Sequence, residues 1–251
     1  MKKIIINADD FGINEVVTKE IERQILAGRV TSTTVMANGV CLEEVKRFAA
    51  EHPEVSFGVH LCLSEFVSLT KSEGLMRAGL TDEKGAFIHK AICKIKDFDN
   101  LTLDAIRSEL HAQIDIISSL DFPISHADSH HHVHTIYPLR EVFADTLKKR
   151  GIKKVRLGGD FRTLRMKAHV GLWLKRIALN KFYKKQFITT DGFYSYAELV
   201  NDRVTANDGE TVELMCHPGH PGVSFCKEMK LVKDNVAIDN DVKLISYNEL
   251  Y

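Results

Sequence analysis

Carboxylate and imidazole side chains, which serve both metal binding and proton transfer, gather in four short segments of the chain. These segments are NADDFG (7 to 12), GVHL (58 to 61), HADSHHHVH (126 to 134) and MCHPG (215 to 219). Imidazole and carboxylate ligands without thiolates suit Zn²⁺, Mn²⁺, Co²⁺ or Fe²⁺, whereas carboxylate-rich sites suit Mg²⁺. Two histidines and one aspartate leave open positions for water and substrate, as catalytic sites require. The remaining carboxylate and histidine would then be free to move protons.

Several of these residues also have simpler explanations. Asp9 or Asp10 alone could cap the helix that follows, a role that aspartate fills well. His60 lies on an apolar segment and could be a hydrogen-bonded core histidine. The segment from 126 to 134 could be a solvated metal-scavenging tract, although such tracts are usually terminal and low in complexity. Two adjacent acids and so dense a histidine cluster favour a functional site over these alternatives.

The histidine cluster is expected to lie mostly on one face of a strand. The segment PISHADSH (123 to 130) is predicted to be that strand. While it continues, alternation places His126, Asp128, His130, His132 and His134 on one face and only His131 on the other. So many imidazoles on one face would repel one another when protonated, which makes a purely structural role a poor explanation.

The elements that must position these residues alternate between strand and helix. Helical spacing is found at 14 to 30, 41 to 52, 103 to 120 and 138 to 151. Strands are predicted at 3 to 7, 31 to 38, 55 to 63, 123 to 130, 153 to 159, 186 to 192 and 211 to 218, with a short one in KLISYNEL (243 to 250). This order predicts an α/β fold with seven or eight mostly parallel strands. Ligands bind at the C-terminal ends of such strands, so the four segments are expected to converge there.

Residues 64 to 100 interrupt this alternation and carry no sustained period. A segment this long inside a compact domain is more often a functional lid than an idle loop. No internal repeat, low-complexity tract or Pro/Gly linker divides the chain. We therefore expect one domain, residues 1 to 251, with a lid-like insertion at about 64 to 100.

Composition narrows the class of protein. The 34 Lys and Arg residues balance the 34 Asp and Glu residues, which gives no general field for nucleic acid or a membrane surface. No stretch resembles a signal peptide or approaches the ~18 apolar residues that span a bilayer. The 5 cysteines are scattered without C-x-x-C spacing, so neither a disulfide framework nor a thiolate zinc site is indicated. We therefore expect a cytoplasmic protein.

The four segments, together with TSTTVMANG (31 to 39), resemble the YdjC-type carbohydrate deacetylases, which include chitooligosaccharide (diacetylchitobiose) deacetylase. The blocks follow the family's order along essentially the whole chain. The resemblance implies a distorted, TIM-like (β/α) barrel and a metal-dependent hydrolase that removes acetyl groups from N-acetylated sugars, with a place in chitin or polysaccharide degradation. Its one divalent cation is expected to be Mg²⁺ or Zn²⁺, with Mn²⁺ or Co²⁺ as alternatives. The expected partner is an N-acetylated mono- or oligosaccharide, and a homodimer is compatible with the sequence.

The resemblance also implies roles for individual residues. Asp10, His60 and His130 would hold the metal, Asp9 would be the general base and His217 the general acid. For His217, a structural histidine capping the turn after its strand is the alternative. Asp128 and His132 would orient ligand imidazoles or contact substrate. Arg156 would keep Asp9 ionised, or else form a surface salt bridge.

The chain departs from the family pattern in two places, the insertion at 64 to 100 and an extra histidine, His220, and both are expected to affect substrate choice. The alternative enzyme is a metal-dependent phosphoesterase or another amidohydrolase acting at the same rim. A non-catalytic sugar-binding or metal-binding module is disfavoured, because Asp9 and His217 would then have no task.

Overall fold

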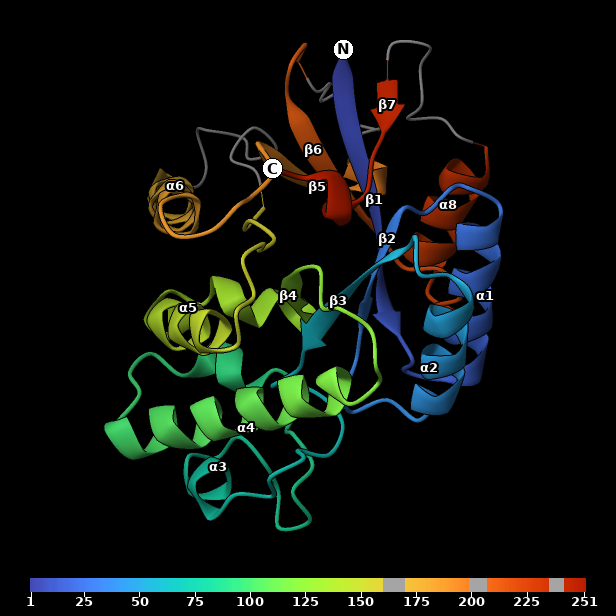
Figure 1. Ribbon diagram of the computed structural model, residues 1–251. Coiled ribbons are helices and arrows are strands. Elements are labelled where there is room, and N and C mark those ends of the chain that lie inside the picture. Colours follow the sequence, from blue (N-terminus) through green and yellow to red (C-terminus); the bar gives the residue numbers. More distant parts are fainter. Residues whose placement is uncertain (160–169, 199–206, 235–241) are drawn as a thin grey trace.

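The computed structural model describes residues 1–159, 170–198, 207–234 and 242–251. Strands and helices alternate along this part of the chain, as expected (Figure 1). The strands are β1 (Lys2–Phe11), β2 (Ser32–Val35), β3 (Ser56–Leu61), β4 (Ala127–Ser129), β5 (Gly192–Ser195), β6 (Thr211–Cys216) and β7 (Val242–Leu244). The helices are α1 (Glu15–Leu26), α2 (Leu42–Glu51), α3 (Glu73–Arg77), α4 (Asn100–Ser118), α5 (Arg140–Lys149), α6 (Val170–Lys184) and α8 (Val223–Lys233). Short 3₁₀ turns cover Ala91–Lys94, His130–Thr135, Tyr137–Leu139 and Tyr247–Glu249.

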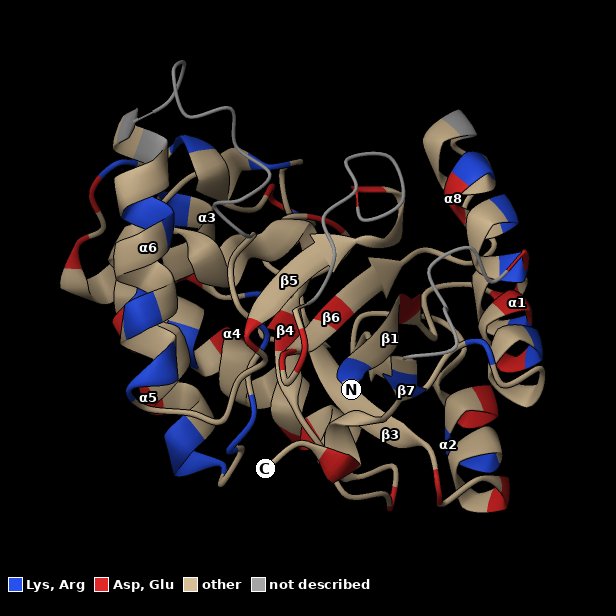
Figure 2. Cartoon of the chain, turned by 90° about the horizontal axis from the view of Figure 1, so that it is seen from above, with Lys and Arg blue, Asp and Glu red and all other residues tan. Residues whose placement is uncertain are grey.

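The strands form one parallel sheet in the order β4-β3-β2-β1-β6-β5, with β7 paired to the start of β1. Around the curled sheet, α1, α2 and α8 lie to the right in Figure 1, and α4, α5 and α6 lie below and to the left; Figure 2 shows the same division. The buried faces of α1, α2, α4 and α5 belong to one core. This curled half-barrel is compatible with the expected distorted barrel, but it is not a full TIM barrel, because β4 and β5 end the path of paired strands. The predicted strand at 153 to 159 forms only single-residue bridges, from Val155 to Ala127 and from Lys154 to Ile188.

Alternation along β1 separates the apolar core from the polar centre of the molecule. Ile4, Ile6 and Ala8 belong to the main core, which also contains the buried face of α1. Asn7 and Asp9 project from the opposite face of the strand, yet both are almost completely buried. Buried polar groups require partners. The alternation of apolar and polar residues along β1 therefore requires a polar network inside the curl of the sheet.

The segment from 64 to 100 folds against α4 as a small substructure of its own. Antiparallel bridges join Val67 to Ala86 and Thr81 to Phe87, and the backbone N–H groups of Leu69 and Thr70 donate to Glu109 of α4. The segment is thus anchored to the domain, and its role as a lid stays a prediction. In the described residues, every helix is too short or too polar to cross a membrane.

Candidate metal centre

A bulge in β1 turns both adjacent aspartates toward the same site. Ala8 pairs with Thr33 and Phe11 pairs with Val35, so β1 has one more residue than β2 over this stretch. Asp10 lies within this bulge and has a φ of 69°. This is a left-handed conformation, which aspartate tolerates better than most residues. Bulges re-aim side chains near active sites. Successive residues of a regular strand face opposite ways, and the bulge removes that constraint.

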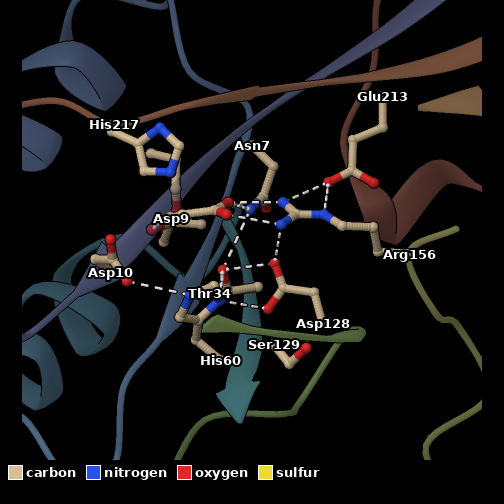
Figure 3. Close-up of polar contacts among 12 residues, drawn as sticks. Asn7, Asp9, Asp10, Thr34, His60, Asp128, Ser129, Arg156, Glu213 and His217 are labelled. Carbon is tan, nitrogen blue, oxygen red and sulfur yellow. Dashed lines mark hydrogen bonds and ion pairs between the residues drawn. The ribbon is translucent and has the colours of Figure 1, made fainter. Parts of the chain in front are cut away.

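Asp10, His60 and His130 converge from three parts of the sequence. His60 lies near the end of β3, and His130 follows directly after β4. Asp10 Oδ1 is 3.1 Å from His60 Nε2 and 2.8 Å from His130 Nδ1 (Figure 3 shows Asp10 and His60). The ligand atoms of the three residues all lie within 4.8 Å of one another, and all three side chains are buried. Two imidazole nitrogens meeting at one buried carboxylate fit a divalent cation.

Asp128 orients His60 from the neighbouring strand. The register of β3 and β4 pairs these two residues, and His60 Nδ1 donates to Asp128 Oδ1 at 2.6 Å. Histidine ligands of metals commonly donate their second N–H to a carboxylate in this way. Burial alone would lower the pKa of His60, but the carboxylates of Asp128 and Asp10 outweigh it and raise that pKa well above its usual range. Together these contacts exclude a simple apolar core histidine.

Arg156 is the buried cation of the site. Its guanidinium is completely buried and donates to both oxygens of Asp9, at 2.7 and 2.6 Å. Nη1 also lies 2.6 Å from Asp128 Oδ2 (Figure 3). Burial would raise the pKa of Asp9, but the charge and hydrogen bonds of Arg156 hold it well below its usual range. The contact with Asp9 is the one expected from the sequence, and a surface salt bridge is ruled out.

His217 follows β6 beside Asp9. The register pairs Ala8 with Cys216, so the next residues on the two strands are Asp9 and His217 (Figure 3). The Nδ1 atom of His217 is 3.3 Å from Oε2 of Glu228 on α8. Burial would lower the pKa of His217, but the bond to Glu228 and the charge of Asp9 raise it overall. A raised imidazole pKa suits a proton donor.

The expected one-face alternation of the histidine cluster is wrong beyond β4. The strand ends at Ser129, and the chain then turns through His131 and His132, whose φ angles are 51° and 54°. The ring of His132 packs 5.5 Å from that of Phe193, on the side of a cavity, rather than in line with His130. His132 therefore faces this cavity, whereas Asp128 contacts the imidazole of His60.

Three residues to which the sequence analysis gave no role at the metal also contact this network. Nε2 of His220 lies 3.0 Å from Asp10 Oδ2. Nε2 of His130 lies 2.8 Å from Oε2 of Glu65, in the 64 to 100 segment. Buried Glu213 accepts from Arg156 and from the hydroxyl of Tyr247. Only His220 had a sequence signal, its spacing of three residues from His217.

A cavity of about 870 Å³ opens beside His132. Its wall includes His132 and Met215, two residues before His217, together with the aromatic rings of Tyr137 and Phe193. The cations Lys96, Lys175 and Arg176 also line it. Its volume is within the range of small-molecule sites, about 300 to 1,000 Å³.

Comparison with known proteins places the chain in a family. The model of the YdjC-like protein family matches residues 3–248. A carbohydrate deacetylase of Geobacillus stearothermophilus is 30% identical over 264 residues, which cover 98% of this chain and 97% of the relative. A chitooligosaccharide deacetylase of Salmonella typhimurium strain LT2 is 30% identical over 225 residues, covering 86% and 81% respectively.

A solved structure from Enterococcus faecalis V583, provisionally described as a cellobiose-phosphate cleavage protein, has the same fold. It superimposes with a TM-score of 0.70 at 24% identity and covers 98% of this chain and 97% of its own. The family match extends over nearly every described element, and it confirms the resemblance seen in the sequence. The protein belongs to the YdjC-like family.

Proposed function

We propose that this protein hydrolyses the acetamide of N-acetylated sugars, such as chitooligosaccharides, with one divalent cation held by Asp10, His60 and His130. The observation that carries the proposal is the convergence of these three buried side chains at the ends of β1, β3 and β4, with Asp9 and His217 alongside. Membership of a family whose curated relatives are named carbohydrate deacetylases supports the choice of substrate.

A bound divalent cation would polarise the acetamide carbonyl and lower the pKa of an attacking water toward ~7. Two residues of the chain, Asp9 and His217, then carry out one proton transfer each. Asp9 is kept ionised and fixed by Arg156, and it accepts the proton of the water. His217 donates a proton to the departing amine, which is too basic to leave as an anion. Its contact with Glu228 holds the imidazole in place for that transfer.

Sugar binding is assigned to the cavity next to His132. Aromatic rings such as Tyr137 and Phe193 present flat apolar faces to a sugar, and His132 lines the same cavity with its ring packed against Phe193. Because Met215, next to the carboxyl end of β6, lines this cavity, a bound acetamide would lie near His217 and its neighbour Asp9. The native metal is expected to be Mg²⁺ or Zn²⁺, with Mn²⁺ or Co²⁺ as alternatives. The two imidazoles favour a borderline ion, whereas the carboxylates around the site favour Mg²⁺.

A metal-dependent phosphoesterase is the second candidate. The observation that favours it is the set of cations in the cavity wall, Lys96, Lys175 and Arg176, because phosphate recognition recruits such residues. The two reactions release different products. A chitooligosaccharide and a phosphate monoester are therefore incubated with the protein, with and without a chelator, and acetate and phosphate are measured. Chelator-sensitive acetate release supports the deacetylase, whereas phosphate release without acetate release would replace it.

A further inference from the structure

Glu65 connects the 64 to 100 segment to a proposed metal ligand. Its Oε2 lies 2.8 Å from Nε2 of His130, and its Oε1 lies 3.0 Å from Nδ1 of His89. The Glu65 side chain is 34% exposed, while that of His130 is 10% exposed. The contact therefore runs from the surface segment inward to the metal centre.

The two proposed histidine ligands have matching surroundings. His60 turns one nitrogen to Asp10 and the other to the carboxylate of Asp128. His130 likewise turns Nδ1 to Asp10 and Nε2 to the carboxylate of Glu65. A carboxylate on the second nitrogen fixes the tautomer and the ring orientation of a histidine ligand. Glu65 thus stands in the same relation to His130 as Asp128 does to His60.

The backbone around Glu65 is held in an uncommon conformation. Phe66, the next residue, has a φ of 64°, which costs a non-glycine residue of its size about 1 kcal/mol or more. Its carbonyl accepts from the N–H of Phe87, and the hydroxyl of Ser64 contacts Nδ1 of His131 at 2.9 Å. Strain that the surrounding contacts maintain is characteristic of functional positions. These contacts fix the place from which Glu65 reaches His130.

We propose that Glu65 is a positioning residue for the metal ligand His130. Its carboxylate accepts the Nε2 proton of His130, which leaves Nδ1 without a proton and directed at Asp10. The inference rests on the metal site proposed above and extends it into the 64 to 100 segment. It gives that segment a defined task, which is to complete the metal centre.

A second ion is the competing explanation for the same geometry. Ligand atoms of Glu65, His130 and His131 also lie within 4.8 Å of one another. One nitrogen cannot both donate its proton to Glu65 and bind a cation. The two assignments therefore exclude each other, and the number of ions bound per chain separates them.

The test measures metal binding directly. Parent protein, Glu65→Ala and Glu65→Gln are stripped of metal and titrated with Zn²⁺ by calorimetry, and the absorption spectrum of the Co²⁺ form is recorded. The control is Glu83→Gln, which changes an exposed glutamate of the same segment. Thermal unfolding of the metal-free proteins shows that each variant is folded.

Glu65→Ala is expected to bind one Zn²⁺ at least ~10-fold more weakly than the parent, with an altered Co²⁺ spectrum. Glu65→Gln is expected to fall between them, because its amide oxygen accepts the same proton without the charge, and Glu83→Gln is expected to match the parent. A Glu65→Ala affinity within about twofold of the parent, with an unchanged spectrum, would overturn the role of Glu65 alone. Two ions in the parent and one in Glu65→Ala would make Glu65 a ligand of a second ion. A parent that binds no metal would refute the metal centre itself.

Discussion

Replacing Glu213 with glutamine is expected to change how the stability of the protein depends on pH. Glu213 lies in β6, fully buried, where it accepts from Arg156 Nε at 2.8 Å and from the hydroxyl of Tyr247. Arg156 also forms ion pairs with Asp9 and Asp128, so one buried cation contacts three buried carboxylates. Burial raises the pKa of Glu213 from 4.5 to about 7 in spite of Arg156. Burial therefore keeps Glu213 protonated in mildly acidic solution.

The sign and size of the effect follow from linkage. Between the unfolded pKa of 4.5 and the folded pKa of about 7, the folded chain holds a proton that the unfolded chain releases. Raising the pH through this window therefore favours unfolding. The full difference corresponds to about 3 kcal/mol of stability, present in acid and lost by about pH 8. Glutamine has the same shape and keeps an oxygen for Arg156, but it does not titrate.

Urea unfolding followed by circular dichroism at a series of pH values measures this contribution. Subtracting the parent's free energy of unfolding from that of Glu213→Gln cancels the groups that titrate alike in both proteins. The difference should move in favour of the variant by about 3 kcal/mol between acidic solution and pH 8. Glu43→Gln, which changes an exposed glutamate of α2, is the control for removing a carboxylate from the surface. A difference for Glu213→Gln that stays constant with pH would refute the conclusion that burial raises the pKa of Glu213.

The remaining predictions concern the metal centre and the proton transfers. His60→Ala and His130→Ala should each lose metal binding and activity together, because two remaining ligands hold a divalent ion poorly. Full activity with one bound metal in either variant would show that the replaced histidine is not a ligand. Asp9→Asn should keep the metal and lose turnover, whereas Asp10→Asn should lose the metal as well, and the opposite pattern in a metal titration would exchange the two roles. His217→Ala should lose turnover of an acetamide by about 10²-fold or more while an activated ester, whose leaving group needs no proton, is much less affected. Equal losses on both substrates would show that His217 does not protonate the amine.

The convergence of the site could be predicted because strand order and strand ends suffice for it. Asp10, His60 and His130 each lie at or near the end of a strand, and parallel strands bring their carboxyl ends together. The contact between Arg156 and Asp9 was expected from the family resemblance, although its segment forms bridges rather than a strand.

The details that decide side-chain direction could not be predicted, because they depend on backbone irregularities and distant contacts. The bulge at Asp10 and the turn through His131 are left-handed conformations at non-glycine residues, which no local pattern signals. Glu65 and Glu213 are single acidic residues without a motif, and only the fold brings them to His130 and Arg156. The strand predicted at 153 to 159 differs for a related reason, since this segment has the composition of a strand but pairs through isolated residues.

The central claim is that one divalent cation at Asp10, His60 and His130 enables this chain to release acetate from an N-acetylated sugar. It is tested most directly by stripping the protein of metal, adding Zn²⁺ or Mg²⁺ in small steps and measuring the initial rate of acetate release from diacetylchitobiose. The account predicts no release by the stripped protein and, for the ion that binds tightly, a rate that rises to a plateau at one equivalent. Undiminished acetate release by the stripped protein, or none at any metal concentration, would contradict it.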